Sequence, residues 1–307
     1  MTKKIADESL FLTVIKIYTN SSLRKAGNRH IRTILYNFFY LQYKAALFPG
    51  RIPVSDVDHP LDAEIPFIPS WVKIYLDFIP FWIRIIGFLL RTYKKDAIKP
   101  AADFIDAMSR TYQVAAEVYQ KNLSTTERPR YLAKPRFVII HATDPHLMCI
   151  PSLHVMVVVR AYTKFQDIIN KRGDAERFSA QTEEIKQGAI KITEAILYIK
   201  QHSINCVGAS LYAMSKFDPP LLPFAEAEDF TSKLFLNEKN PDFETSEKVR
   251  KHIIDLYSKF LAEGENASSW DKPIMDFLDE RIIKKDKKVK EGKKNVLKLE
   301  GNKPNFV

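Results

Sequence analysis

Three short strings of the sequence combine basic, hydroxyl and imidazole side chains where helices are expected to begin or end. They are KNLSTTERP at 121–129, PSLH at 151–154 and KQHSINC at 200–206. Backbone amides at the start of a helix have no partner within the helix, so they can bind anions together with such side chains. The three strings therefore indicate a site for a phosphate or a similar anion.

The PSLH string is the most informative of the three. A proline in the first turn of a helix lacks only an amide hydrogen that would have no helical partner. The amides of Ser152, Leu153 and His154 would then face an anion, and the Ser152 hydroxyl would add a donor. Taken alone, the string is also typical of an ordinary helix start with a solvated histidine.

In combination, the strings resemble motifs of the type 2 phosphatidic acid phosphatase and vanadium haloperoxidase superfamily. Its first motif, K-x-x-x-x-x-x-R-P, is matched by Lys121, Arg128 and Pro129. Its second motif, P-S-G-H, is matched by PSLH, with Leu153 in the glycine position. The resemblance covers about residues 100–216.

The third motif, S-R-x-x-x-x-x-H-x-x-x-D, is matched only at His202. Ile196 stands where the family has arginine, and Cys206 stands where it has aspartate. The family's aspartate orients the attacking histidine, and a thiol is a poor hydrogen-bond acceptor for that purpose. We expect Asn205 to replace the aspartate and Lys200 to supply part of the missing positive charge.

The resemblance implies a metal-independent phosphohydrolase or phosphotransferase acting on a phosphate monoester or a pyrophosphate, with a lipid-linked substrate favoured. His202 would attack phosphorus and form a phosphohistidine, and His154 would protonate the leaving oxygen. The groups expected to bind the phosphoryl oxygens are Lys121, Arg128, Ser152, Leu153 and Lys200. No cofactor is expected.

Two other functions remain open. A catalytically degraded module would bind phosphorylated lipid or phosphate without turning it over, and a helical scaffold for protein–protein interaction would make the three strings coincidental. A metal site at His141, Asp144 and His146 is a minor alternative, because neither H-E-x-x-H nor a cluster of carboxylates is present.

Helical periodicity dominates the segments that must position these residues. Only nine glycines occur in 307 residues, which favours helices over strand-rich folds with many turns. Apolar residues at three- and four-residue steps predict helices from Pro100 to the KNLSTTERP string, over 179–200, and over 245–264. The last of these is expected to be capped by Thr245 or Ser246 and to end at Gly264.

Most of the remaining segments are also predicted to be helical. Further helices are expected over 8–19, 29–47, 152–170, 204–216 and 269–285, and only 137–141 reads like a strand. The sequence therefore predicts an all-α helical bundle resembling the phosphatase core. We expect one helical domain over 1–280, followed by a basic tail over 281–307.

The net charge of +10 lies mainly in that tail. Residues 281–307 hold ten Lys or Arg against three acidic residues, a balance of +7 that leaves +3 for the other 280 residues. A nucleic-acid-binding surface across the body is therefore not supported, and no nucleic-acid partner is expected. The two cysteines, Cys149 and Cys206, exclude a disulfide scaffold.

Residues 65–90 form the most apolar stretch, with only Lys73, Asp77 and Arg84 charged. Charges and three prolines argue against a membrane-spanning helix. We expect a pair of helices, either in the core, which is favoured, or in a membrane interface. The opening residues do not form a secretory signal, so a cytoplasmic location is expected. Peripheral contact with the inner face of the membrane, through 65–90 and the tail, is the alternative.

Overall fold

Helices account for most of the chain that the structure describes, as expected for an all-α protein. The structure is a computed structural model, and it describes residues 4–283. The basic tail predicted over 281–307 therefore lies almost entirely outside the described residues. Buried apolar side chains form one cluster that runs from Ile5 to Leu278.

The elements, in chain order, are as follows. The α-helices are α1 (Leu10–Thr19), α2 (Ser21–Ile34), α3 (Leu41–Leu47), α4 (Val72–Tyr75), α5 (Phe78–Tyr93), α6 (Ile98–Tyr119), α7 (Pro135–Thr143), α8 (Leu153–Lys171), α9 (Ser179–Tyr198), α10 (Ile204–Phe217), α11 (Phe224–Ser232), α12 (Phe243–Glu263) and α13 (Lys272–Asp279). The short helical turns are η1 (Ile5–Asp7), the π-helical η2 (Leu35–Tyr40), η3 (Pro60–Ala63), η4 (Pro69–Trp71) and η5 (Lys94–Ala97). The strands are β1 (Val54–Asp56) and β2 (Leu123–Thr125).

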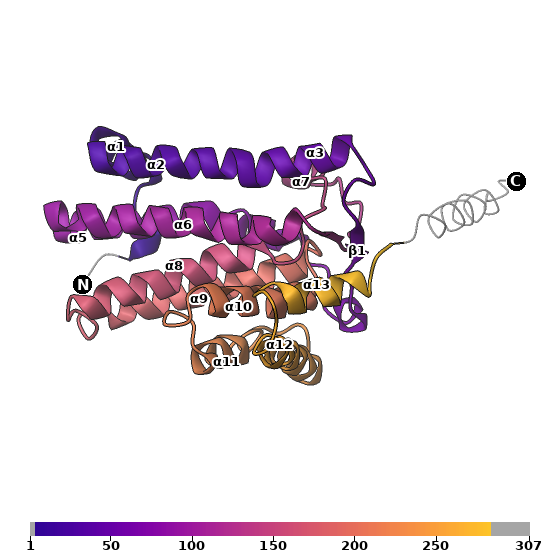
Figure 1. The fold of residues 1–307 in the computed structure, drawn as a ribbon. Coiled ribbons are helices and arrows are strands. Elements are labelled where there is room, and N and C mark those ends of the chain that lie inside the picture. Colours follow the sequence, from indigo (N-terminus) through magenta and orange to yellow (C-terminus); the bar gives the residue numbers. More distant parts are fainter. Residues whose placement is uncertain (1–3, 284–307) are drawn as a thin grey trace, which may run out of the picture.

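The helices stack in layers (Figure 1). Helices α1 to α3 form the upper layer, α5 and α6 lie beneath it, and α8 to α10 lie beneath those, with α11 and α12 on the far side. Helix α8 packs against α6, α9 and α10, so it lies at the centre of the bundle. The predicted apolar stripes of α6, α9 and α12 are buried, which is why these helices pack as layers.

The segment 65–90 belongs mainly to the core, the alternative that the sequence favoured. It forms η4, α4 and most of α5, and Trp82, Ile85, Phe88 and Leu89 of α5 are all buried. Few of its side chains, such as Leu76, remain exposed for contact with a membrane. None of the described helices is both long enough and apolar enough to span a bilayer.

The structure corrects three local predictions. Residues 137–141 belong to α7 rather than to a strand, because Pro135 takes the first position of a helix and the apolar side chains continue it. The side chain of Asp242, not Thr245 or Ser246, caps α12 by accepting a hydrogen bond from the Thr245 amide. The helix expected over 269–285 is shorter, from Lys272 to Asp279.

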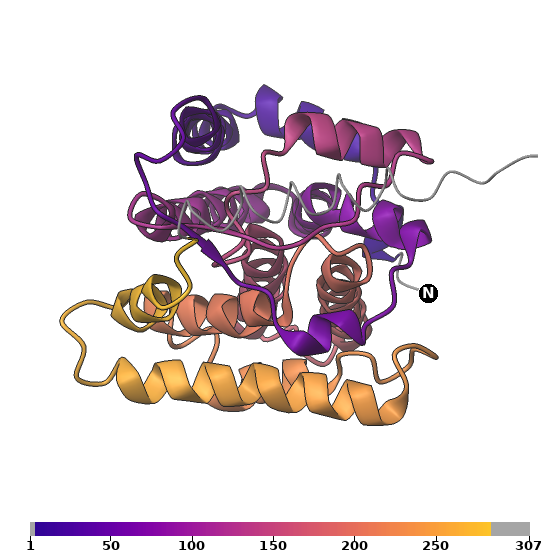
Figure 2. The same cartoon turned by 90° about the vertical axis from the view of Figure 1, so that its right-hand side faces the viewer.

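A two-stranded parallel pair fixes the loop that leads into α8. Strand β1 pairs with β2, so the segment after α3 lies beside the segment after α6 (Figure 2). The amide of Ser124 in β2 donates to the Leu147 carbonyl at 3.0 Å, and its hydroxyl accepts from the Ile150 amide at 2.7 Å. These bonds hold residues 147–150, and with them the PSLH string, in place.

The close approach of α1 to α5 at Gly87 can be tested by a double-mutant cycle. A Cβ atom at residue 87 would clash with Oγ1 of Thr13. Gly87→Ala should therefore lower the free energy of unfolding by about 1–3 kcal/mol. In a Thr13→Ala background the same change should be neutral or stabilising by up to about 1 kcal/mol, since alanine favours helices. Urea unfolding measures both, and an effect independent of residue 13 would contradict this packing.

Candidate active site

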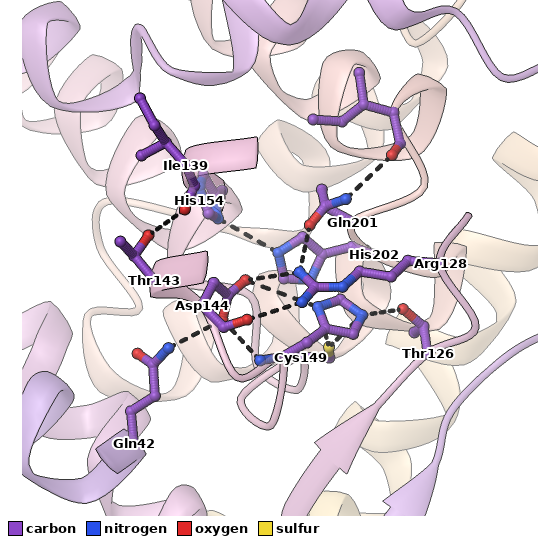
Figure 3. A network of polar contacts seen from close by, with 12 residues as sticks. Gln42, Thr126, Arg128, Ile139, Thr143, Asp144, Cys149, His154, Gln201 and His202 are labelled. Atoms are coloured by element: carbon purple, nitrogen blue, oxygen red, sulfur yellow. Dashed lines mark hydrogen bonds and ion pairs between the residues drawn. The ribbon is translucent and has the colours of Figure 1, made fainter. Parts of the chain in front are cut away.

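Two histidines from distant parts of the sequence meet at the ends of two helices. His154 lies in the first turn of α8, and His202 lies two residues before the start of α10. Nε2 of His202 is 3.3 Å from Nδ1 of His154 (Figure 3). The same nitrogen is 3.3 Å from Oγ of Ser152, the residue that caps α8. The second and third strings of the sequence therefore converge, as the resemblance implied.

Hydrogen bonds at the start of α8 fix this convergence. The Ser152 amide donates to Oγ of Ser210 at 2.7 Å, and that hydroxyl donates to the Cys206 carbonyl at 2.6 Å. On the other side, Lys200 adopts a left-handed backbone conformation, with φ of 54°, directly after α9. The chain therefore reverses within a few residues and presents His202 to His154.

The histidine pair lies at a cavity of about 210 Å³ whose lining is mostly apolar. Tyr75 and Phe78 pack against the His154 ring, with ring centroids 4.4 and 4.2 Å away. Other apolar lining residues are Phe38, Phe39, Leu76, Tyr112, Ile140 and Met148. The polar side chains that line the cavity besides the two histidines are Gln42, Thr143, Asp144, His146 and Cys149. The site is thus a mostly apolar pocket with a few converging polar groups, a pattern typical of sites for small molecules.

A hydrogen-bonded wall built around Asp144 closes one side of the pocket. Its carboxylate accepts from Nε2 of Gln42 at 3.0 Å and from the His146 amide at 2.8 Å. Arg128 lies 3.4 Å from the same carboxylate and donates to the Asp144 carbonyl at 2.8 Å. It also donates to Oε1 of Gln201 at 3.1 Å, which links the first string of the sequence to the third.

The protonated side chain of His146 lines the cavity and gives it a positive charge. Its Nε2 is 2.7 Å from Oγ1 of Thr126, and Cys149 Sγ lies 3.8 Å from the same nitrogen. Burial lowers the pKa of His146, but Cys149 and Asp144 outweigh that effect and raise the pKa to about 9. Burial likewise opposes ionisation of Asp144, but hydrogen bonds from His146 and nearby positive charges hold its pKa at about 2. Arg128 and the protonated His146 are the positively charged groups of this wall, and Asp144 is its carboxylate.

His154 and His202, in contrast to His146, are neutral at neutral pH because burial lowers their pKa values. Burial lowers the pKa of His154 to about 4, and burial together with repulsion from His154 and His146 lowers that of His202 well below its usual value. A neutral His202 keeps a lone pair on one ring nitrogen. Its Nδ1 is buried and has no side-chain hydrogen-bond partner in the part of the chain that the structure describes, while a backbone hydrogen bond to Cys149 acts to raise the pKa of the ring.

The structure brings together most, but not all, of the residues that the sequence singled out. His154, His202 and Leu153 line the pocket, Ser152 lies buried beside them in contact with His202, and Arg128 reaches the pocket through Asp144. Lys200 lies in a neighbouring cleft with Arg128, where its ammonium donates to the carbonyls of Asp62 and Ile65. Lys200 is thus adjacent to the histidines, but its ammonium group already donates to these two carbonyls.

Two of the predicted roles are wrong in this structure. Lys121 forms an ion pair with Asp271, which precedes α13, and does not line the pocket, because the chain turns away after α6 ends at Tyr119. Asn205 does not contact His202: its amide donates to the Val57 carbonyl at 3.0 Å, and its Oδ1 lies 2.8 Å from Nε2 of His252 on α12. No replacement for the family's aspartate is therefore found at Asn205.

Sequence reasoning missed the roles of Asp144 and His146. The sequence suggests for both only a metal site with His141, and the described residues contain no group of three or more His, Cys, Asp or Glu side chains that would hold a metal ion. Their polar spacing, with a proline between them, was the signal available. Nothing in the sequence pointed to Gln201 or Thr126, except that each lies close to a residue that matches one of the family motifs. Cys149 and Cys206 are both buried free thiols.

The opposite shifts of His146 and His154 can be measured by NMR titration of histidine ring resonances. We expect a midpoint at about pH 9 for His146 and about pH 4 for His154, assigned with His146→Asn and His154→Asn. Because the unfolded pKa is about 6.5, the protonated His146 stabilises the fold fully below that pH, and this stabilisation is lost as the pH rises through 9. A midpoint for His146 below 6.5 would show that the Asp144 wall does not hold it charged.

The corrected place of Asn205 predicts a structural effect that leaves His202 undisturbed. Asn205→Ala should lower the free energy of unfolding by about 1–3 kcal/mol, because the Val57 carbonyl and the His252 ring lose a buried partner. The ring resonances of His252 should shift, and those of His202 should not. A shift confined to His202 would restore the role expected from the sequence.

Comparison of the chain with known protein families, with curated proteins and with solved structures gives no match. The resemblance to a phosphatase family therefore depends on the three short strings alone. Any function has to be argued from the pocket and its side chains.

Proposed function

We propose that the protein is a metal-independent phosphohydrolase or phosphotransferase that works through a phosphohistidine on His202. The observation that carries this proposal is the contact of His202 Nε2 with His154 Nδ1 and Ser152 Oγ, both at 3.3 Å, at the wall of the pocket. A nucleophile and a proton donor for the leaving group lie within reach of one substrate phosphorus in this arrangement. The likeness of the strings to the phosphatidic acid phosphatase motifs points to the same reaction.

The burial of His202 suits it to attack. In the neutral ring, the Nε2 lone pair forms the P–N bond as the bond from phosphorus to the leaving oxygen breaks, and His154 gives that oxygen its proton. Burial keeps the His154 ring neutral, but a bound phosphate dianion would raise its pKa and let it carry the proton. Water then attacks the phosphohistidine, with His154 as the base, and releases phosphate.

The surroundings supply the charge that phosphoryl transfer requires. Negative charge spreads over the equatorial oxygens in the transition state, so donors fixed beforehand stabilise it. The protonated His146 lines the pocket, Ser152 offers its hydroxyl, and the Leu153 amide stands at the start of α8. In this proposal the Arg128–His146 wall takes the place that the sequence gave to Lys121.

The pocket favours a phosphate ester with an apolar organic group. A volume of about 210 Å³ admits a phosphoryl group and a small part of what it is attached to. The apolar remainder would lie against Phe38, Phe39 and Leu76. This lining supports a phosphorylated lipid or a small apolar phosphate ester, as a monoester or a pyrophosphate, and peripheral attachment to a membrane would give access to the former.

A phosphate-binding module without turnover is the second candidate. It is favoured by one observation, the absence of a side-chain acceptor for Nδ1 of His202 among the described residues. Attack by Nε2 creates an imidazolium, and an acceptor at Nδ1 would stabilise it, as the aspartate of a Ser-His-Asp triad does. Without that acceptor the chemical step is slower, while binding of phosphate is unaffected.

A quenched-flow experiment with a ³²P-labelled ester, in the presence of EDTA, tests the enzyme. Alkaline quenching during turnover should trap label on the protein, since phosphohistidine survives base, and His202→Ala should abolish both label and phosphate release. His154→Ala should slow esters with poor leaving groups by about 10²–10⁴-fold and spare good ones. His252→Asn, which alters a histidine outside the pocket, is the matched control and should leave both signals unchanged.

The outcomes separate the two candidates. Label that persists in His202→Ala would place the nucleophile elsewhere, and release that stops with EDTA and returns with a divalent ion would contradict the metal-independent chemistry. A wild-type protein that binds phosphate but releases none from any ester would favour the binding module.

A further inference from the structure

Large apolar side chains are exposed mainly on the upper layer of the structure. Of the 21 large apolar side chains that are exposed among the described residues, 13 lie within residues 10–48. These residues form α1, α2, η2 and α3, which run side by side or end to end along one side of the molecule (Figure 1). We call their exposed side the N-terminal face.

The spacing shows that whole helix faces are exposed rather than scattered residues. In α1, Phe11, Ile15 and Tyr18 follow each other at four- and three-residue steps and are all exposed, Phe11 at 74%. Along η2 and α3 the same steps join Tyr36, Tyr40, Tyr43 and Leu47, the last at 73% exposure. Apolar stripes normally turn towards the core, so a stripe that faces outward marks an interaction surface.

The charge of this segment is entirely positive. Residues 9–55 contain seven Lys or Arg and no Asp or Glu. Helix α7 joins the same layer through bonds from Tyr43 and Gln42 to residues 143 and 144, and it exposes Val138 and Ile139 (Figure 2). The stretch 130–143, which contains α7, adds three more Lys or Arg and again no carboxylate.

A hollow on the N-terminal face combines both properties. It measures about 560 Å³ and is lined by aromatic and leucine side chains together with Lys44 and Arg51. The Arg51 guanidinium lies 4.5 Å from the centre of the Phe48 ring, and the Lys44 ammonium lies 5.4 Å from that of Tyr40. Cations beside an apolar hollow suit a ligand with a negative head and an apolar tail.

We propose that the N-terminal face docks in the plane of a membrane that contains anionic phospholipid. Tyrosine and phenylalanine would enter the headgroup region, leucine and isoleucine would reach the acyl chains, and the Lys and Arg side chains would contact lipid phosphates. A second copy of the chain fits less well, because a symmetric dimer would press two strongly positive faces together. The proposal does not depend on the proposed function, although the pocket shares Phe39 with this face.

Flotation of the full-length protein with vesicles tests the docking. The vesicles are phosphatidylcholine alone or with about 30% phosphatidylglycerol. The test variant is Phe11→Asp with Leu47→Asp, and the matched control is Leu236→Asp with Phe243→Asp, which adds the same charge at side chains exposed by 59% and 76% on another part of the structure. Because all four side chains are exposed, both variants should fold, and circular dichroism checks this.

We expect the wild type to bind the anionic vesicles more tightly than neutral ones, and less tightly as salt rises. The test variant should lose tenfold or more of its partition coefficient, and the control should stay within twofold of the wild type. Equal losses in the two variants, or none in the test variant, would overturn the proposal. So would a dimer in sedimentation velocity that the test variant dissociates. Release of phosphate from p-nitrophenyl phosphate, read in parallel, reports on the proposed function separately.

Discussion

The hydrogen bond from the Ser152 amide to Oγ of Ser210 holds the start of α8 against α10, and the candidate site depends on it. It spans 2.7 Å, is fully buried, and joins residues 58 positions apart. Together with the bonds of Ser124 to residues 147 and 150, this bond positions the Ser152 hydroxyl and the His154 ring at the capped start of α8. The chain reversal at Lys200 then places one further side chain, His202, against the start of α8.

Burial divides the pocket into a neutral half and a charged half. His154 lies between Tyr75 and Phe78, which exclude water and favour the uncharged ring. His146 is also buried, but Cys149 and the Asp144 carboxylate beside it favour the charged form. Two histidines a short distance apart therefore have opposite protonation states at neutral pH. In the proposed reaction, the neutral half holds the nucleophile, His202, with a free lone pair, and the charged half provides a positive charge for the phosphate.

Much of the fold, and the helix start that carries Ser152 and His154, could be predicted from the sequence. Apolar periodicity located α6, α9 and α12 because each of these helices buries an apolar stripe, and the PSLH string located the capped start of α8. Pairings across the bundle could not be predicted. Lys121 and Asn205 are held by Asp271 and His252, which come from the far end of the chain, and nothing local reveals such partners.

The most direct test of the site is a crystal structure of the protein with orthovanadate, which mimics the five-coordinate phosphorus of the transition state. We predict vanadium bonded to Nε2 of His202, with its oxygens facing the Ser152 hydroxyl and the Leu153 amide and the apical oxygen facing His154. Vanadate bound elsewhere, or a pocket without it at saturating concentration, would contradict the assignment of this pocket to phosphoryl chemistry.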